Sequence, residues 1–153
     1  CPRHLFWYAA AMLRLALIAA ILAPSALAGA PRLTGPYEAE VVRVIDGDSF
    51  EARVTIWLDQ EALTVARLAG IDTAERSAPC LGARLAANAA RAFLAARIEG
   101  RRVRLSDIAR DKYGGRILAR AAGEDGRDLG ALLAAYGLAR PYDGGRRASW
   151  CAR

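Results

Sequence analysis

Three short segments of the sequence place charged side chains in a turn or at the end of a predicted strand. They are Asp46-Gly47-Asp48-Ser49, the run RLAGIDTAE from Arg67 to Glu75, and the run DKYGGR from Asp111 to Arg116. Carboxylate oxygens are good ligands for hard cations, and arginine guanidiniums pair with phosphate or carboxylate groups through two hydrogen bonds. Each segment alone is an ordinary hairpin or surface turn, so a functional interpretation depends on the three occurring together in this order.

Together, the three segments resemble the signatures of the staphylococcal nuclease (thermonuclease) family. That family's motifs run Asp-Gly-Asp-Thr, then Arg-Leu-x-Gly-Ile-Asp-Thr-Pro-Glu, then Asp-Lys-Tyr-Gly-Arg followed by Leu-Ala, and this chain has DGDS, RLAGIDTAE and DKYGGRILA. The resemblance spans about Val41 to Tyr142 and includes Gly137-Leu138-Ala139. It implies an OB-fold barrel and a calcium-dependent phosphodiesterase that acts on DNA and RNA.

The resemblance also implies a role for each matching position. Calcium would be bound by the carboxylates of Asp48 and Asp72 and by the backbone carbonyl of Thr73. The scissile phosphate would be held by Arg67 and Arg116, and Glu75 would act as general base. Lys112 and Tyr113 match positions that contact the terminal phosphate of the nucleotide.

This set of residue types suits phosphodiester hydrolysis, because the substrate is anionic and the five-coordinate transition state gathers further charge. Calcium takes oxygen ligands and can clamp the phosphate and orient a water. Guanidiniums add hydrogen bonds to the equatorial oxygens, and a carboxylate at Glu75 could take a proton from the attacking water. Asp46 either supports a metal ligand from outside or is a plain turn residue.

The chain departs from the family motifs at three positions. Ser49 replaces Thr and keeps the hydroxyl, while Ala74 replaces a Pro that would have stiffened the loop before Glu75. In the third motif, Gly115 stands where Arg is expected, but Arg116 is in register when counted back from Leu118-Ala119. A one-residue bulge before Arg116 would reconcile the two counts, so Arg116 is predicted to be the second phosphate arginine.

The elements that must position these residues are predicted from hydrophobic periodicity. Strands are expected at 37–45, 50–57, 63–69, 101–107 and 116–122, and helices at 83–98 and 129–136. The first helix is expected to bury a stripe of Leu85, Ala89, Ala92, Phe93 and Ala96, and the chain after Pro141 reads as a loop. Strand groups on both sides of a helix predict a mainly β, α+β fold: a five-stranded Greek-key barrel of the OB type with two to three helices.

Residues 12–28 have the pattern of a secretory signal peptide. A basic Arg14 precedes an apolar run, and Ala26-Leu27-Ala28 provides the small residues of a cleavage site. The alternative is a membrane anchor, which would place Arg14 inside the bilayer at about 2.5–3.5 kcal/mol. Met12 is the natural start of such a peptide, so we expect residues 1–11 to be a mis-assigned start or a fragment end. We therefore expect a leader at 1–28, a segment at 29–36 and one nuclease-like domain at 37–153.

Composition and cysteine count agree with one small exported domain. The 153 residues carry a net charge of +6, and only Lys112 among the 22 basic residues is a lysine. The arginine excess fits either a polyanionic ligand or the codon usage of a GC-rich genome. Without residues 1–28, which hold Arg3 and Arg14 and no acid, 125 residues with a charge of +4 remain. In an oxidising compartment, Cys80 and Cys151 are predicted to form a disulfide, the alternative being two free thiols.

Three functions are compatible with these features. The first is a periplasmic or secreted calcium nuclease, expected to be a monomer without stable membrane association after signal cleavage. The second is an OB-type domain that binds nucleic acid through basic grooves and aromatic stacking without cutting it. The third is a small envelope interaction module held by its disulfide. Every charged position of the motifs is filled, which favours the first.

Overall fold

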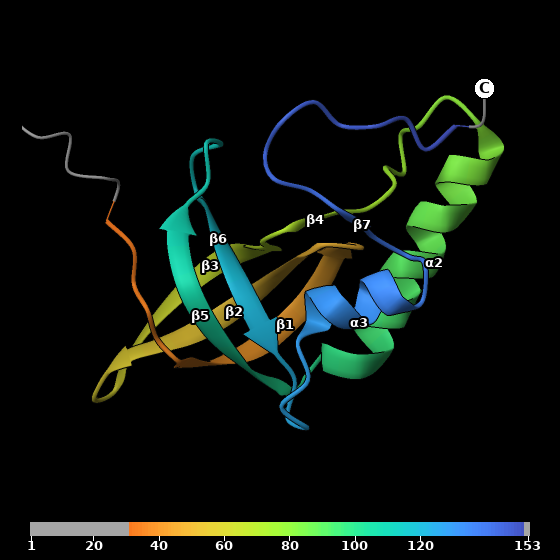
Figure 1. Ribbon diagram of the computed structural model, residues 1–153. Coiled ribbons are helices and arrows are strands. Elements are labelled where there is room, and N and C mark those ends of the chain that lie inside the picture. Colours follow the sequence, from red (N-terminus) through yellow and green to blue (C-terminus); the bar gives the residue numbers. More distant parts are fainter. Residues whose placement is uncertain (1–30, 152–153) are drawn as a thin grey trace, which may run out of the picture.

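Five strands close a barrel in the order β1-β2-β3-β6-β5 (Figure 1). They are β1 (Tyr37–Asp46), β2 (Ser49–Trp57), β3 (Gln60–Leu68), β5 (Arg102–Arg110) and β6 (Arg116–Ala122). Neighbouring strands are antiparallel except β3 and β6, which run parallel. The pairing of β3 with β6 joins the first three strands to β5 and β6 and helps to close the barrel. This confirms the predicted OB-type barrel. The computed structural model describes residues 31–151, so the predicted signal peptide at 1–28 lies outside the described residues.

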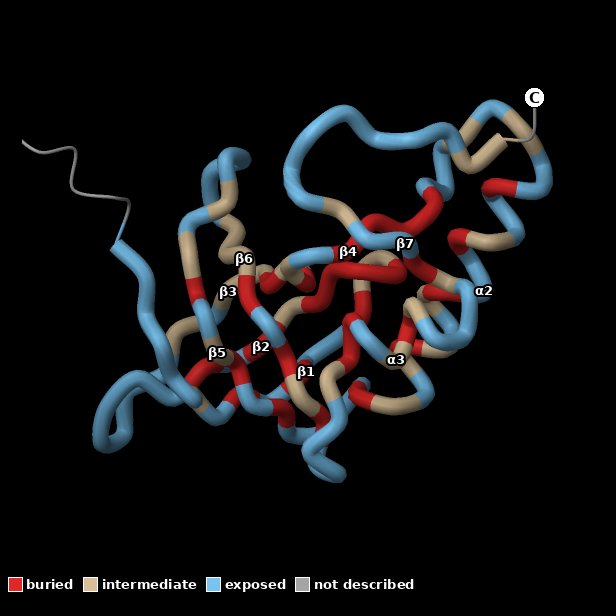
Figure 2. Tube along the Cα trace, in the orientation of Figure 1, coloured by how far each residue is buried: buried red, intermediate tan, exposed pale blue. Residues whose placement is uncertain are grey.

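The barrel interior is filled by alternate side chains of each strand, as the period of two along a strand requires. Phe50, Ala52 and Val54 of β2 are buried in that interior. Ile56 is 52% exposed, because β2 runs on beyond the packed interior. Figure 2 shows the resulting alternation of buried and exposed residues along the strands.

Helix α2 (Leu81–Ile98) covers one side of the barrel, but with a different face from the predicted one. Its buried residues are Ala83, Ala87, Ala90, Leu94 and Ile98. Leu85, which the predicted stripe placed inside, is 58% exposed. The prediction was wrong because alanines occur all round this helix, so the apolar period alone does not single out the face that small side chains allow to approach closely.

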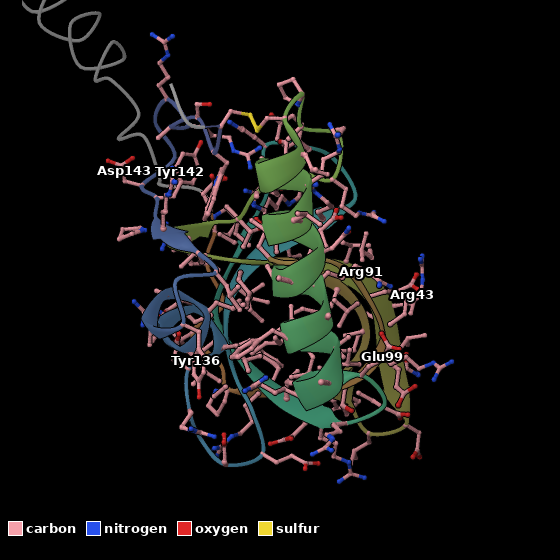
Figure 3. The ribbon with its side chains drawn as sticks, turned by 90° about the vertical axis from the view of Figure 1, so that its right-hand side faces the viewer. Arg43, Arg91, Glu99, Tyr136, Tyr142 and Asp143 are labelled. Carbon is pink, nitrogen blue, oxygen red and sulfur yellow. A yellow bond between two sulfur atoms is a disulfide. The ribbon has the colours of Figure 1, made fainter. Side chains whose placement is uncertain are left out.

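Two polar contacts hold α2 against the end of β1 (Figure 3). The Arg91 side chain donates hydrogen bonds to the carbonyls of Val44 and Ile45, each at 3.1 Å. The backbone N–H of Val44 donates to the side chain of Glu99, the residue directly after the helix, at 2.9 Å. Both contacts fix the strand immediately before the turn that contains Asp48.

A second, two-stranded sheet brings the C-terminal part of the chain to the mouth of the barrel. It pairs β4 (Ile71–Asp72) with β7 (Arg140–Pro141), which follows the short helix α3 (Leu129–Ala135). The Asp128 carboxylate caps α3 by accepting a hydrogen bond from the N–H of Ala131 at 2.8 Å. No helix within residues 31–151 is long and apolar enough to cross a membrane.

After β7, the chain continues as the C-terminal tail, residues 142–151, beside the loop that leads from β4 into α2 (Figure 1). The tail ends in the predicted disulfide between Cys80 and Cys151, which is present (Figure 3). Cys80 immediately precedes α2. The disulfide therefore ties the tail to the start of the main helix, as the cysteine count predicted.

Candidate active site

The centre of the candidate site is Arg67, whose guanidinium lies between two carboxylates. Its Nη2 atom is 3.0 Å from Oδ2 of Asp48 and 3.7 Å from Oδ1 of Asp72. Pairing of β2 with β3 explains this approach, because Ser49 lies opposite Arg67 and the N–H of Leu68 donates to the carbonyl of Asp48 at 2.8 Å. Three residues of the first two motifs thus meet at one end of the barrel.

The polar groups of this cluster are removed from water. Within residues 31–151, the buried polar residues are Asp48, Ser49, Asp72 and Thr73, and all belong to the first two motifs. Burial raises the pKa of the Asp48 carboxyl above its ordinary value of 3.8, although Arg67 and a 2.8 Å hydrogen bond from the Ser49 hydroxyl oppose the shift. Buried carboxylates without matching cations are unstable, so the cluster is built to hold positive charge.

Only one of the two carboxylate oxygens of Asp72 accepts a hydrogen bond. Its Oδ2 atom accepts a hydrogen bond from Nε1 of Trp150 at 3.1 Å. Its Oδ1 atom is buried and accepts no hydrogen bond, although guanidinium nitrogens of Arg67 and Arg147 lie near it as ion pairs. A buried carboxylate oxygen without a hydrogen bond, paired only through charge, fits a position for a cation.

Arg147, which the sequence motifs did not identify, occupies this position. Its guanidinium is paired with Asp72 and Glu75, and it donates a hydrogen bond to the backbone carbonyl of Thr73 at 3.1 Å. Burial lowers the pKa of Arg147, but its contacts with Asp72 and Glu75 outweigh this and raise it. The signal that could have found Arg147 is the predicted disulfide, because Cys151 carries the tail back past the loop of residues 73–80.

Arg116 and part of the carboxylate cluster line one cavity, but the Arg116 guanidinium is paired with Asp111. The cavity has a volume of about 390 Å³, and its walls include Asp48, Arg67, Glu75 and Arg116. Both Nε and Nη2 of Arg116 donate to Oδ2 of Asp111, at 3.0 and 2.7 Å. To reach a phosphate in the cavity, Arg116 has to exchange this partner.

The extra glycine before Arg116 is accommodated in the loop rather than as a bulge in the paired strands. Asp111 donates its N–H to the carbonyl of Arg116 at 3.2 Å, so pairing of β5 and β6 continues up to the loop of residues 112–115. The register shift of this pair lies farther away, between Ser106 and Ala109. Gly115 has a φ of +81°, which glycine adopts without strain. Arg116 therefore keeps its place as the first residue of β6.

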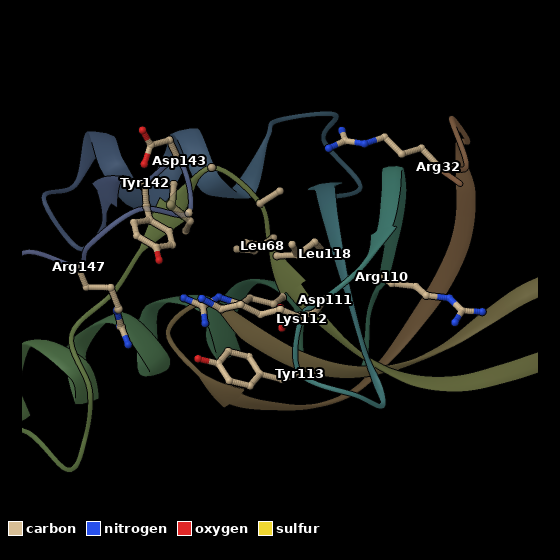
Figure 4. A pocket seen from close by; sticks show the side chains of 15 residues that line it. Arg32, Leu68, Arg110, Asp111, Lys112, Tyr113, Leu118, Tyr142, Asp143 and Arg147 are labelled. Carbon is tan, nitrogen blue, oxygen red and sulfur yellow. The ribbon is translucent and has the colours of Figure 1, made fainter. Parts of the chain in front are cut away.

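Lys112 and Tyr113 line an adjoining cavity of about 510 Å³ (Figure 4). Tyr142 lies across from Tyr113, with Lys112 between them, and Arg147 reaches the same space from the tail. Arg67 and Arg147 line both cavities, so the two spaces adjoin at the carboxylate cluster. Lys112 and Tyr113 of the third motif thus line the cavity next to the one that contains Asp48.

The donor set fits a hard cation such as calcium, with Arg147 displaced. Among the residues described, no three His, Cys, Asp or Glu side chains form a cluster suited to a metal ion. A cation here would rely on two carboxylates and the Thr73 carbonyl, all of them oxygen ligands. Asp46 is not part of this set, because its carboxylate pairs with Nε of Arg76 at 2.8 Å.

A protein-family model agrees with the motifs, although no curated protein matches the chain. The model of the family described as "Staphylococcal nuclease homologue" matches residues 65–149, which is 85 of the 153 residues. The matched range contains Arg67, Asp72, Glu75, Arg116 and Arg147 and excludes Asp48. The chain therefore belongs to the staphylococcal nuclease homologue family.

Proposed function

We propose that this protein is an exported, calcium-dependent nuclease that hydrolyses the phosphodiester bonds of DNA and RNA. The observation that carries this proposal is the Arg67 guanidinium held between the buried carboxylates of Asp48 and Asp72 on the wall of a cavity. Glu75 and Arg116 line that cavity too. A cation position beside two arginines and a water-accessible carboxylate is a combination suited to a phosphodiester.

In this proposal, Arg67 and Arg116 hold the phosphate. Their guanidiniums donate hydrogen bonds to non-bridging oxygens, and these bonds strengthen as negative charge builds up there. Asp48 and Asp72 keep Arg67 oriented, while Arg116 leaves Asp111 for the substrate. The chemistry that calcium supplies, when bound by Asp48, Asp72 and the Thr73 carbonyl, is a divalent charge beside the phosphate.

Glu75 is the proposed general base. Its side chain is 57% exposed, so water has access to its carboxylate, which accepts the proton of the attacking water. In the structure the carboxylate is paired with Arg147. Glu75 becomes available as a base only when Arg147 moves away.

The adjoining cavity is the proposed position of the nucleotide next to the scissile bond. Lys112 offers a cation for a terminal phosphate, and Tyr113 and Tyr142 offer aromatic rings on which a base could stack. Export is supported by the Cys80–Cys151 disulfide, because such bonds persist mainly in oxidising compartments.

A second candidate function is nucleic-acid binding without cleavage. The observation that favours it is Arg147, which fills the cation position and pairs with the proposed base. A fixed guanidinium at that point would leave a basic groove able to hold a phosphate backbone, without the cation that the hydrolysis needs.

Digestion of plasmid and single-stranded DNA separates the two functions. We expect cleavage in the presence of calcium, loss of cleavage with a chelator, and a large loss in Glu75→Ala. Glu61→Ala is the matched control, since Glu61 is an exposed glutamate at the far end of β3 from Arg67. Tight DNA binding without calcium-dependent cleavage would instead establish the second function.

A further inference from the structure

We propose that Arg147 is a built-in competitor for the cation position, which calcium must displace before the enzyme is active. This inference rests on the proposed function. It assigns to the C-terminal tail a role that the three motifs do not include. The tail would set the calcium concentration at which the site loads.

The contacts of Arg147 show why the two cations exclude each other. Its Nη2 atom is 2.5 Å from Oδ1 of Asp72 and 3.1 Å from the Thr73 carbonyl oxygen. Calcium binds oxygen ligands at about 2.3–2.6 Å, so a calcium ion on these two oxygens would overlap the nitrogen. Two positive charges so close also repel each other strongly. Loading of the site therefore requires Arg147 to withdraw.

The tail is held at both ends, which keeps Arg147 close to the carboxylates. On the near side, the N–H of Tyr142 donates to the carbonyl of Gly70 at 2.9 Å. On the far side, Trp150 is bonded to Asp72, and Cys151 is joined to Cys80. A group tethered in this way has a high effective concentration at its target.

A further contact stiffens the far end of the tail. The guanidinium carbon of Arg140 lies 3.9 Å from the centre of the Trp150 ring, a cation–π distance. Arg140 also donates to the carbonyl of Ser149 at 2.9 Å. Arg140 belongs to β7, which is paired with β4, so the strand that carries Asp72 also supports the tail that delivers Arg147.

The effect belongs to Arg147 and not to basic charge in the tail generally. The neighbouring Arg146 lines a different hollow, which Arg140 and Asp72 also border. It makes no ion pair with Asp72 or Glu75. Arg146 is therefore a matched control: the same residue type, one position away, on the same tail.

The test is the dissociation constant for calcium, measured by isothermal titration calorimetry on the purified protein. If Arg147 fills the position about nine-tenths of the time, its removal raises apparent affinity about tenfold. We expect that gain in Arg147→Gln and no change in Arg146→Gln. The double variant Cys80→Ser/Cys151→Ser keeps Arg147 but removes the covalent attachment of the tail, and we expect a smaller gain in the same direction.

Each result decides the matter. Unchanged or weaker calcium binding by folded Arg147→Gln, with calcium-dependent cleavage retained in the wild type, would overturn this inference and leave the proposed function standing. Absence of calcium binding in both the wild type and Arg147→Gln would overturn both. If Arg147→Gln does not fold in chelator, the double cysteine variant carries the test, and the absence of any gain there is the contrary result.

Discussion

At the scale of single residues, the site is a set of buried carboxylates balanced by arginines. Asp48 and Asp72 are 6% and 4% exposed, and the cations nearest to them are Arg67 and Arg147. Burial of a charge destabilises a fold unless a partner compensates. Even paired charges lose their hydration on burial, so the cluster costs stability when no ligand is bound, and a bound cation would offset that cost.

Asp48 provides a measurable consequence in the absence of calcium. Because its folded-state pKa is raised, the folded protein holds a proton there in a pH range where the unfolded chain has lost it. Stability from this group is present at low pH and is lost as the pH rises through the folded-state pKa. As the pH falls, the unfolding free energy of the wild type should therefore rise relative to that of Asp48→Asn. The rise is up to about 1.4 kcal/mol for each unit by which folding raises the Asp48 pKa.

Urea denaturation in chelator, at about pH 7 and then at lower pH towards the ordinary Asp value, measures this difference. The wild type and Asp48→Asn are compared at each pH, so that the contribution of all other titrating groups cancels in the difference. A difference in unfolding free energy that stays constant, or that moves in favour of Asp48→Asn as the pH falls, would contradict the account.

Some residues of the site could be predicted from local sequence motifs and others could not. Asp48, Arg67 and Asp72 belong to short motifs whose local order is enough to identify them. Arg147 and Trp150 lie in a loop with no motif, and their position depends on β7 pairing and on the disulfide. Contacts between residues more than seventy positions apart, such as Arg147 with Thr73, cannot be read from a local pattern.

At the scale of elements, the close approach of α2 to the turn between β1 and β2 fixes the site. A Cβ atom on Gly47 would lie 2.6 Å from the Cβ of Ala90 and 3.1 Å from Oγ1 of Thr73. Gly47 is thus required by packing rather than by turn geometry alone. The sequence predicted the turn, but not this contact, because the predicted face of the helix did not include Ala90.

Gly47→Ala should therefore weaken both the fold and the site. Overpacking of this kind lowers the free energy of unfolding by about 1–3 kcal/mol, and here it pushes on Thr73 and the turn next to Asp48. Thermal unfolding and nuclease rate are the measurements. Gly82→Ala is the control, since a Cβ there has open space and α2 gains helix propensity. Equal behaviour of the two variants would show that the packing argument is wrong.

At the scale of the whole molecule, a barrel with standard connections carries a tail that closes back over its mouth. The five barrel strands and the two helices within residues 31–151 were predictable as elements, because hydrophobic periods and turn residues mark each of them. The small β4–β7 sheet was not, since each of its strands is two residues long. The tail depends on the disulfide, which spans 71 positions of the chain.

Removal of that disulfide should be costly. A loop of this length constrains the unfolded chain by about 4 kcal/mol in the chain-entropy model, so Cys80→Ser/Cys151→Ser should unfold at a markedly lower urea concentration. A reducing agent should lower the stability of the wild type to that of the double variant and leave the variant unchanged. A double variant as stable as the oxidised wild type would contradict this expectation.

The central claim is that the carboxylate cluster hydrolyses phosphodiesters with the help of calcium. Its most direct test is the initial rate of single-stranded DNA cleavage as a function of calcium concentration, for the wild type and Asp72→Asn side by side. We expect a saturable rise in rate for the wild type and none for the variant, with both proteins folded in chelator. A wild type that does not cleave at any calcium concentration, or a variant that cleaves equally well, would contradict it.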